Sequence, residues 1–130
     1  MIKLGTMSLN VRNTTATEFA GIVSDLGLDV IELHTSAFES TDLDYLRGLK
    51  MDLMRKGLPI GYIGISNNFG RPVEEHPEQV ALIKNWIDVA SFMSCPIVRV
   101  FAAYLPEDCT DEEAISVSYT HLTLPTNREV

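Results

Sequence analysis

The chain has 130 residues, which fits one domain or part of one and falls well short of the roughly 250 residues of a closed barrel of eight βα units. Its 18 acidic and 10 basic residues give a net charge of −8 without any long basic run, so we expect no nucleic-acid partner. Cys95 and Cys109 lack metal or redox spacing, and neither a leader nor a membrane-length apolar run is visible, so we expect a cytoplasmic protein with no membrane partner.

The first predicted elements are a strand and a helix. Residues 2–7 are apolar-rich and short, as strands are, and Ser8 ends them. A helix is predicted next, because Thr15 and Glu18 have the spacing of a capping box and apolar side chains then recur every three or four residues. Gly27 stands where a helix commonly ends in a left-handed glycine.

The second strand and the second helix are predicted from alternation and from a leucine stripe. Residues 28–34 alternate, and alternate side chains of a strand point to opposite faces, so Glu32 and His34 share one face. The helix that follows is predicted to have Thr41 as its N-cap and Gly57 as its end. Its apolar stripe consists of Leu46, Leu49 and Leu53.

An apolar stretch that starts at Pro59 predicts the third strand. It stops at residues 66–68, whose polar side chains can bind a ligand or their own backbone. A third helix is predicted with Pro77 in its first turn. Its apolar side is expected to hold Val80, Ile83, Ile87 and Ala90. A fourth strand is predicted within 96–103, and another helix start at Thr110.

Strands and helices therefore alternate strictly along the chain. The strand starts are separated by roughly thirty residues, as in βαβ units, and such alternation predicts a parallel sheet with right-handed crossovers. Residues 5–9 contain no glycine-rich phosphate loop, so a dinucleotide-binding fold loses its main support. The predicted fold class is α/β, with parallel (βα) units that form the first half of a TIM (β/α)8 barrel truncated after strand four.

Four segments follow one another along these predicted units, at residues 27–34, 57–70, 84–90 and 98–101. In this order they resemble the sugar phosphate isomerase/epimerase family of the xylose isomerase-like TIM barrels, over about residues 1–115. The resemblance implies an enzyme that moves a proton next to the carbonyl of a sugar or polyol. It also implies a divalent metal as cofactor of the full-length family member.

The resemblance assigns no metal ligand and no catalytic residue to this chain. In the family the metal ligands, two of them glutamates that act as acid and base, lie mainly on the later strands. Glu32 and His34 belong to the second strand and do not match those positions. We therefore expect the chain to hold no cofactor and to be an inactive fragment of a protein of carbohydrate metabolism.

The end of the chain is predicted to be a non-native tail. Residues 117–126 resemble the translation of a transposase adapter used to prepare sequencing libraries, and residues 127–130 do not continue the helix that starts at Thr110. A natural threonine-rich tail is the alternative. The expected division is residues 1–115 as the N-terminal half of the barrel and residues 116–130 as adapter read-through.

Candidate substrate-binding residues follow the predicted strands. They are His34, Asn67, Asn68, Phe69 and Tyr104. His34 would lie at the barrel mouth, where a substrate hydrogen bond and a plain capping or solvent contact are both open. The two asparagines can donate to and accept from a polyhydroxylated ligand, and the two aromatic rings lie in predicted loops where they could stack on a sugar. His76 is predicted to be a cap or surface residue.

Glu32 and Arg99 are predicted to form a structural ion pair. Side chains from alternate strands of a TIM barrel share a layer, so strands two and four can bring these two residues together in the interior. A buried ion pair is the favoured interpretation, and a catalytic role for Glu32 is the alternative. Trp86, in the middle of the third helix, is predicted to pack between helices.

Two other function classes remain open. The same superfamily includes metal-dependent endonucleases that act on abasic DNA, which the acidic balance of this chain opposes. A small non-enzymatic α/β binding module is favoured only if the tail is natural. For the preferred class the expected partner is a sugar or polyol, and the open edges of a half barrel predict self-association.

Overall fold

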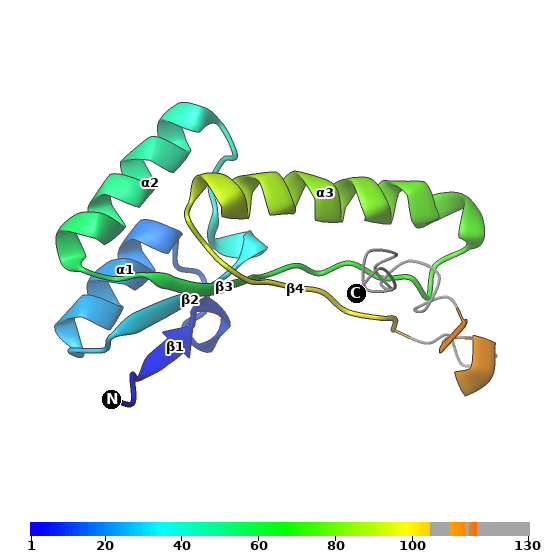
Figure 1. Cartoon of the computed structure of the whole chain (residues 1–130), viewed down its shortest axis with the longest axis horizontal. Coiled ribbons are helices and arrows are strands. Elements are labelled where there is room, and N and C mark those ends of the chain that lie inside the picture. Colours follow the sequence, from blue (N-terminus) through cyan, green and yellow to red (C-terminus); the bar gives the residue numbers. More distant parts are fainter. Residues whose placement is uncertain (105–109, 114, 117–130) are drawn as a thin grey trace, which may run out of the picture. The chain divides into compact units, whose positions relative to one another are not determined.

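The computed structural model describes residues 1–104, 110–113 and 115–116 (Figure 1). Strands and helices alternate within them, as predicted. They are β1 (Gly5–Met7), α1 (Ala16–Asp25), β2 (Val30–His34), α2 (Leu43–Lys56), β3 (Ile60–Gly64), α3 (His76–Phe92) and β4 (Val98–Arg99). The strands form one parallel sheet in the order β1-β2-β3-β4. The predicted tail from residue 117 on lies outside the described residues.

The chain divides into two compact units. The first, which we call the sheet unit, consists of Met1–Ile65 and Trp86–Arg99 and holds the whole sheet. The second, the loop unit, consists of Ser66–Asn85 and the residues from Val100 on. No helix in the described part of either unit is long and apolar enough to cross a membrane.

Helix α1 begins and ends as predicted. The Thr15 hydroxyl oxygen accepts a hydrogen bond from the Glu18 amide at 3.2 Å, and the Glu18 carboxylate accepts one from the Thr15 amide at 2.9 Å. This is the complete capping box, which satisfies two amides that a helix start would otherwise leave unbonded. After the helix, Gly27 has a φ of 70°, the left-handed conformation that glycine adopts without strain.

Helix α2 begins one residue later than predicted. Its N-cap is Asp42 rather than Thr41, because the first helical hydrogen bond runs from the Leu46 amide to the Asp42 carbonyl at 2.9 Å. Ser40 Oγ accepts from the Asp42 amide at 3.0 Å and so holds the approach to the helix. The predicted end is confirmed, since Gly57 is the left-handed C-cap with a φ of 65°.

The hydrophobic core of the sheet unit lies between the sheet and its helices. Helices α1 and α2 contact each other and lie side by side along the sheet (Figure 1). The predicted leucine stripe of α2 is confirmed, because its three members are each 3% exposed or less. Other large buried residues are Phe19, Val23, Ile31, Leu33 and Ile63. Truncating one such core leucine to alanine typically costs about 2–5 kcal/mol.

Within the sheet unit, the buried face of the C-terminal end of α3 includes the predicted Ala90 but not the predicted Ile87. Ile87 is 49% exposed, whereas Val89 and Met93 are buried. Trp86 does pack, but its partner is the ring of Phe38 in the β2–α2 connection, with the ring centroids 5.0 Å apart. Trp86 lies about one helical turn before Ala90, so its ring extends the buried face of α3 toward Phe38. Ile87 then points outward.

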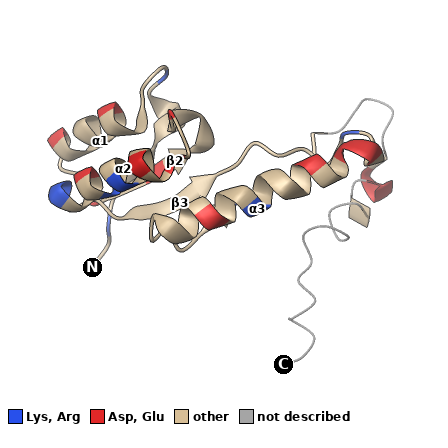
Figure 2. Ribbon diagram, turned by 90° about the horizontal axis from the view of Figure 1, so that it is seen from above, with Lys and Arg blue, Asp and Glu red and all other residues tan. Residues whose placement is uncertain are grey.

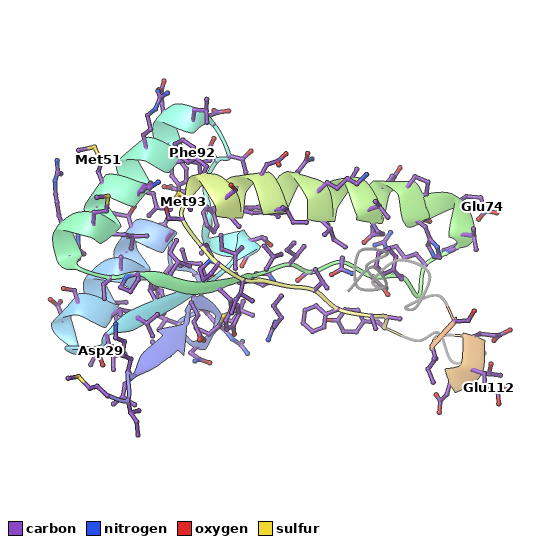
Figure 3. The ribbon with its side chains drawn as sticks, in the orientation of Figure 1. Asp29, Met51, Glu74, Phe92, Met93 and Glu112 are labelled. Carbon is purple, nitrogen blue, oxygen red and sulfur yellow. The ribbon has the colours of Figure 1, made fainter. Side chains whose placement is uncertain are left out.

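Helix α2 is fastened to the end of α3 by a lysine. Lys50 Nζ donates to the Phe92 carbonyl at 2.7 Å, and the ammonium group lies 5.4 Å from the centre of the Phe92 ring. Figure 3 shows Phe92 and Met93 at this end of α3 and Met51 projecting away from α2. Met51 is accordingly exposed.

Strand β3 contains a bulge that the sequence does not reveal. Ile31 of β2 pairs with Ile60 and Leu33 pairs with Ile63, so three residues of β3 span the length of two in β2. Strict alternation would place Tyr62 on the same side as Ile60, but the extra residue lets Ile60 and Ile63 both face the core. Tyr62 is half-buried and faces the other, polar side of the sheet.

The charged residues of the described chain are mixed rather than segregated. Figure 2 shows Lys and Arg interspersed with Asp and Glu on α2 and α3, whereas α1 carries acidic residues alone. Two of the basic side chains are neutralised by neighbours one helical turn away, since Arg47 pairs with Asp44 at 3.2 Å and Lys56 pairs with Asp52. The described surface therefore offers no basic groove of the kind that follows a nucleic-acid backbone.

Candidate functional site

The C-terminal ends of the parallel strands meet at one edge of the sheet. In TIM barrels this edge binds the substrate, because the βα loops converge there. In the sheet unit the edge is formed by Ser8 after β1, His34 at the end of β2, Gly64 at the end of β3 and Arg99 at the end of β4. Three of these four residues carry hydrogen-bonding side chains.

His34 is fixed at this edge by the connections on both sides of it. Its backbone amide donates to Ser8 Oγ at 2.9 Å, and its ring Nδ1 lies 2.8 Å from Ser36 Oγ. The Ser36 amide donates to the same Nδ1 at 3.2 Å, which makes this nitrogen an acceptor and assigns the ring proton to Nε2. The residue is only 8% exposed.

The His34 ring is uncharged at neutral pH. Burial, and after it the positive charge of Arg99, lower the pKa of His34 below its usual 6.5. A buried imidazole that carries its proton on Nε2 can donate a hydrogen bond at the edge without adding charge.

Three residues on the polar face of the sheet form what we call the polar cluster: Glu32, Tyr62 and Arg99. The Arg99 guanidinium lies 5.5 Å from the centre of the Tyr62 ring, a cation–π distance. Burial raises the pKa of Tyr62, and the charge of Glu32 and a side-chain hydrogen bond to it raise the pKa further, against an opposing effect of Arg99. Tyr62 therefore stays protonated beside the Glu32 carboxylate.

Two glycines of β3, Gly61 and Gly64, lie beside the polar cluster. A Cβ on Gly61 would be tight against Val30 Cγ2 at 3.2 Å but would only touch Glu32 Cγ at 3.5 Å. A Cβ on Gly64 would be tight against Met7 Cε at 3.1 Å but would only touch an Arg99 guanidinium nitrogen at 3.6 Å. A methyl group at either position would therefore press on an apolar neighbour rather than on the charged groups.

The predicted burial of the Glu32–Arg99 pair is wrong for the described chain. Arg99 is exposed and Glu32 is half-buried. The bulge in β3 turns Tyr62 to the same face, so the tyrosine contacts both charged residues. The ion pair itself stays a prediction. Sequence reasoning missed Tyr62, because its orientation depends on a register shift that no local pattern encodes.

In the loop unit, the side chain of Asn67 pairs with the backbone of Phe101 as a neighbouring strand would. Its Nδ2 donates to the Phe101 carbonyl at 2.6 Å, and its Oδ1 accepts from the Phe101 amide at 2.8 Å. One side-chain amide thus makes both hydrogen bonds that a paired strand would make with Phe101. The side chain is completely buried, with 0% exposure.

Asn68 closes the loop that follows. Its Oδ1 accepts from the Gly70 amide and from the Tyr104 amide, each at 2.8 Å, and its own amide donates to Gln79 Oε1 at 2.8 Å. A Cβ on Gly70 would collide with the Tyr104 carbonyl oxygen, so this position admits only glycine. Asn67 and Asn68 therefore join the segment after β3 to the segment after β4.

Two aromatic rings of the loop unit differ in exposure. Phe69 is 2% exposed, and its ring lies 5.7 Å from the His76 imidazole, edge to face. His76 is itself buried, with Nε2 2.9 Å from the Arg71 carbonyl, so the surface alternative is wrong. The cap alternative is confirmed, because His76 is the C-cap of the short 3-10 helix Val73–Glu75. Tyr104 is 59% exposed and lies 5.7 Å from the Phe101 ring.

The structure thus brings together four of the predicted substrate-binding residues in the loop unit, and His34 belongs to the sheet unit. Asn67, Asn68 and Phe69 have clear structural partners, and Tyr104 offers an open ring face. Their contact with a substrate stays a prediction.

A pocket adjoins His34 at the same edge of the sheet unit. It has a volume of about 260 Å³ and lies between the β1–α1 and β2–α2 connections. Its lining consists of Ser8, Leu9, Val11, Arg12, Asn13, Thr14, Ser36 and Ala37. Sequence reasoning passed over this connection, although its run of polar residues after the first strand was a signal.

The described residues do not fit the divalent metal that the family resemblance implies. Among residues 1–104, 110–113 and 115–116, no three His, Cys, Asp or Glu side chains gather closely enough to hold a metal ion. Structural metal sites need at least that many protein ligands, and hard cations prefer several carboxylates. No chemical step is therefore assigned to a metal on these residues.

No protein-family model matches the sequence, and no curated protein sequence matches it significantly. Solved structures do match. A xylose isomerase domain protein from Planctomyces limnophilus is 16% identical with a TM-score of 0.66, over 96% of this chain and 50% of that chain. D-psicose 3-epimerase from Clostridium cellulolyticum H10, solved with D-tagatose, is 13% identical with a TM-score of 0.77, over 93% of this chain and 46% of that chain.

A xylose isomerase-like TIM barrel/4-hydroxyphenylpyruvate dioxygenase fusion protein is 12% identical with a TM-score of 0.68, over 91% of this chain and 18% of that chain. The chain spans half or less of the length of each of these proteins. At such identities the likeness shows the fold alone. The chain accordingly has the fold of the first half of a TIM barrel.

Proposed function

We propose that this chain is the N-terminal half of a sugar isomerase or epimerase, and that the C-terminal edge of its sheet is one wall of the sugar-binding site. The observation that carries the proposal is the uncharged His34 ring, held by Ser8 and Ser36 at the edge where TIM barrels bind substrates. A sugar is bound through directed hydrogen bonds rather than through charge, and an imidazole that carries its proton on Nε2 is an uncharged donor.

The polar cluster adds groups of complementary character. Glu32 accepts hydrogen bonds, the Tyr62 hydroxyl donates and accepts, and Arg99 donates. Their side of the sheet corresponds to the interior of a complete barrel, and the fold similarity to sugar epimerases and isomerases supports a sugar or polyol as ligand. In this proposal, His34 and the three residues of the polar cluster orient the substrate.

Proton transfer belongs to the complete protein in this proposal. The carboxylates that would move the proton, and the divalent metal that would polarise the carbonyl, come from the second half of the barrel. The chain on its own binds sugar weakly and has no turnover. The proposed setting is carbohydrate metabolism in the cytoplasm.

Binding can be tested on the full chain by NMR. We expect saturable amide shift changes at His34 and Ser36 when D-tagatose or D-fructose is titrated, with a dissociation constant on the order of 1 mM, which corresponds to about −4 kcal/mol. His34→Ala should weaken this binding at least fivefold, whereas Arg55→Gln, an exposed change on α2, should leave it unchanged. Binding that ignores His34, or no saturable shift with either sugar, would refute the proposed site.

A further inference from the structure

The two outer strands of the sheet each keep one edge open. Within the described residues, β1 pairs with β2 alone and β4 pairs with β3 alone, all in parallel. On β4, the carbonyls of Ile97 and Arg99 accept hydrogen bonds from the β3 side at 3.0 and 2.9 Å. Val98 lies between them, so its own amide and carbonyl point to the open edge. Such an edge is a template for a further strand.

The two open edges match each other in direction and in character. Because all four strands are parallel, a two-fold rotation about the axis of the half barrel sets β1 of a second copy against β4 in the parallel sense, and β4 of that copy against β1. Leu4, just before β1, is 62% exposed, and Ile97, just before β4, is 57% exposed. Both stand at the N-terminal ends of their strands, so this rotation buries an exposed leucine beside an exposed isoleucine at each contact.

The charges of the polar cluster fit the same arrangement. Each interior layer of a TIM barrel consists of four side chains from alternate strands. Glu32 on β2 and Arg99 on β4 occupy alternate strands, and both act on Tyr62 of the strand between them. In a barrel made of two copies, one layer therefore contains Glu32 and Arg99 of each copy, and the strand order makes their charges alternate around the ring.

This ring explains why the pair is not buried in the single chain. Arg99 is exposed and Glu32 is half-buried there, because nothing in the described chain covers the polar face beyond β4. In the two-copy barrel, each arginine lies between two carboxylates, so the charges are enclosed in pairs and no net charge is buried. Each contact between the copies then joins Arg99 of one copy to Glu32 of the other.

We propose that two copies of this chain close an eight-stranded barrel, with β4 of each copy paired to β1 of the other around an alternating ring of Glu32 and Arg99. The second copy takes the edges that the second half of a complete barrel would cover. This inference goes beyond the proposed function, because it depends on the sheet edges and on two charged residues, and on no sugar ligand. Closure uses both edges of both copies, so association stops at the dimer.

Sedimentation velocity of the full chain over a wide range of concentrations tests the proposal. We expect a monomer–dimer equilibrium without larger species. Arg99→Glu gives a ring of four carboxylates and Glu32→Arg a ring of four guanidinium groups, so each variant alone should dimerise at least about a hundredfold more weakly. Arg55→Glu makes the same charge reversal at an exposed position on α2 and should dimerise like the unchanged chain.

Mixing the two ring variants in equal amounts separates lost contacts from lost folding. In the mixed dimer both contacts between the copies again join a carboxylate to a guanidinium, so dimerisation should return, and a variant that fails to fold would not be rescued in this way. Hydrogen exchange at the Val98 amide should slow in the dimer, because that amide gains a strand partner.

Four results would overturn the proposal: a monomer at every concentration, growth past the dimer, ring variants that behave like Arg55→Glu, or an equal mixture that stays monomeric. A dimer that both ring variants lose and their mixture regains establishes it. Sugar binding plays no part in these measurements, so they leave the test of the proposed function independent.

Discussion

We first predict the loss of stability when the buried side-chain amide of Asn67 is removed. It forms two hydrogen bonds with the Phe101 backbone, at 2.6 Å and 2.8 Å, and it is completely buried. In Asn67→Ala the Phe101 amide and carbonyl both lose their partner, and a buried polar group left unsatisfied costs about 1–3 kcal/mol. If water reaches one of the two groups, the expected loss of stability in the loop unit is about 2–4 kcal/mol.

The assay is amide hydrogen exchange, read at Phe101 and at amides of the sheet unit in the same sample. A local loss of about 3 kcal/mol accelerates exchange at Phe101 by roughly two orders of magnitude, since each 1.4 kcal/mol is a factor of ten. Amides of β2 should change little. Asn85→Ala, which truncates an exposed asparagine on α3, is the matched control. Unchanged exchange at Phe101 in Asn67→Ala would refute the strand-substitute role.

Three further predictions concern the loop, the histidine and the sheet edges. Gly70→Ala should lower the free energy of unfolding by about 1–3 kcal/mol, because the new methyl group meets the Tyr104 carbonyl. Gly21→Ala lies in α1 with open space around it, so it should raise the free energy of unfolding by about 0.5–1 kcal/mol. Urea unfolding measures both changes. The pKa of His34 in the folded chain is lowered by burial and by Arg99. Just below pH 6.5 the unfolded chain therefore binds a proton on this ring that the folded chain does not bind. Stability should therefore fall as the pH drops from 6.5 to the lowered pKa, and less so in His34→Gln; equal slopes in the two proteins would contradict the assignment. The open edges of β1 and β4 should cause self-association that grows with concentration in light scattering, and a stable monomer at all concentrations would count against it.

Local sequence chemistry predicted the elements of the fold well. The capping box at Thr15 and Glu18, the left-handed Gly57 and the leucine stripe of α2 each depend on residues within a few positions of one another. Such short-range patterns act through backbone hydrogen bonds and helical periodicity, which are the same in every fold. Strict alternation of strands and helices then left a parallel sheet as the simple topology.

Long-range pairing is what the sequence did not reveal. The bulge in β3 depends on its register with β2, and it alone turns Tyr62 toward Glu32 and Arg99. Asn67 pairs with a backbone 34 residues away, so its polar side chain resembled a ligand donor in sequence. In the sequence Arg12 lies in an ordinary loop, and only the structure shows that it lines a pocket together with two serines.

We propose that residues 1–115 are half of a sugar isomerase or epimerase barrel. The genomic DNA downstream of the codon for Ile115, sequenced from an independent clone, tests this proposal. We expect it to encode four further βα units, with strands that end in Glu, Asp, His and Glu, in place of residues 116–130. Genomic DNA that encodes residues 116–130 and then an in-frame stop codon would contradict it.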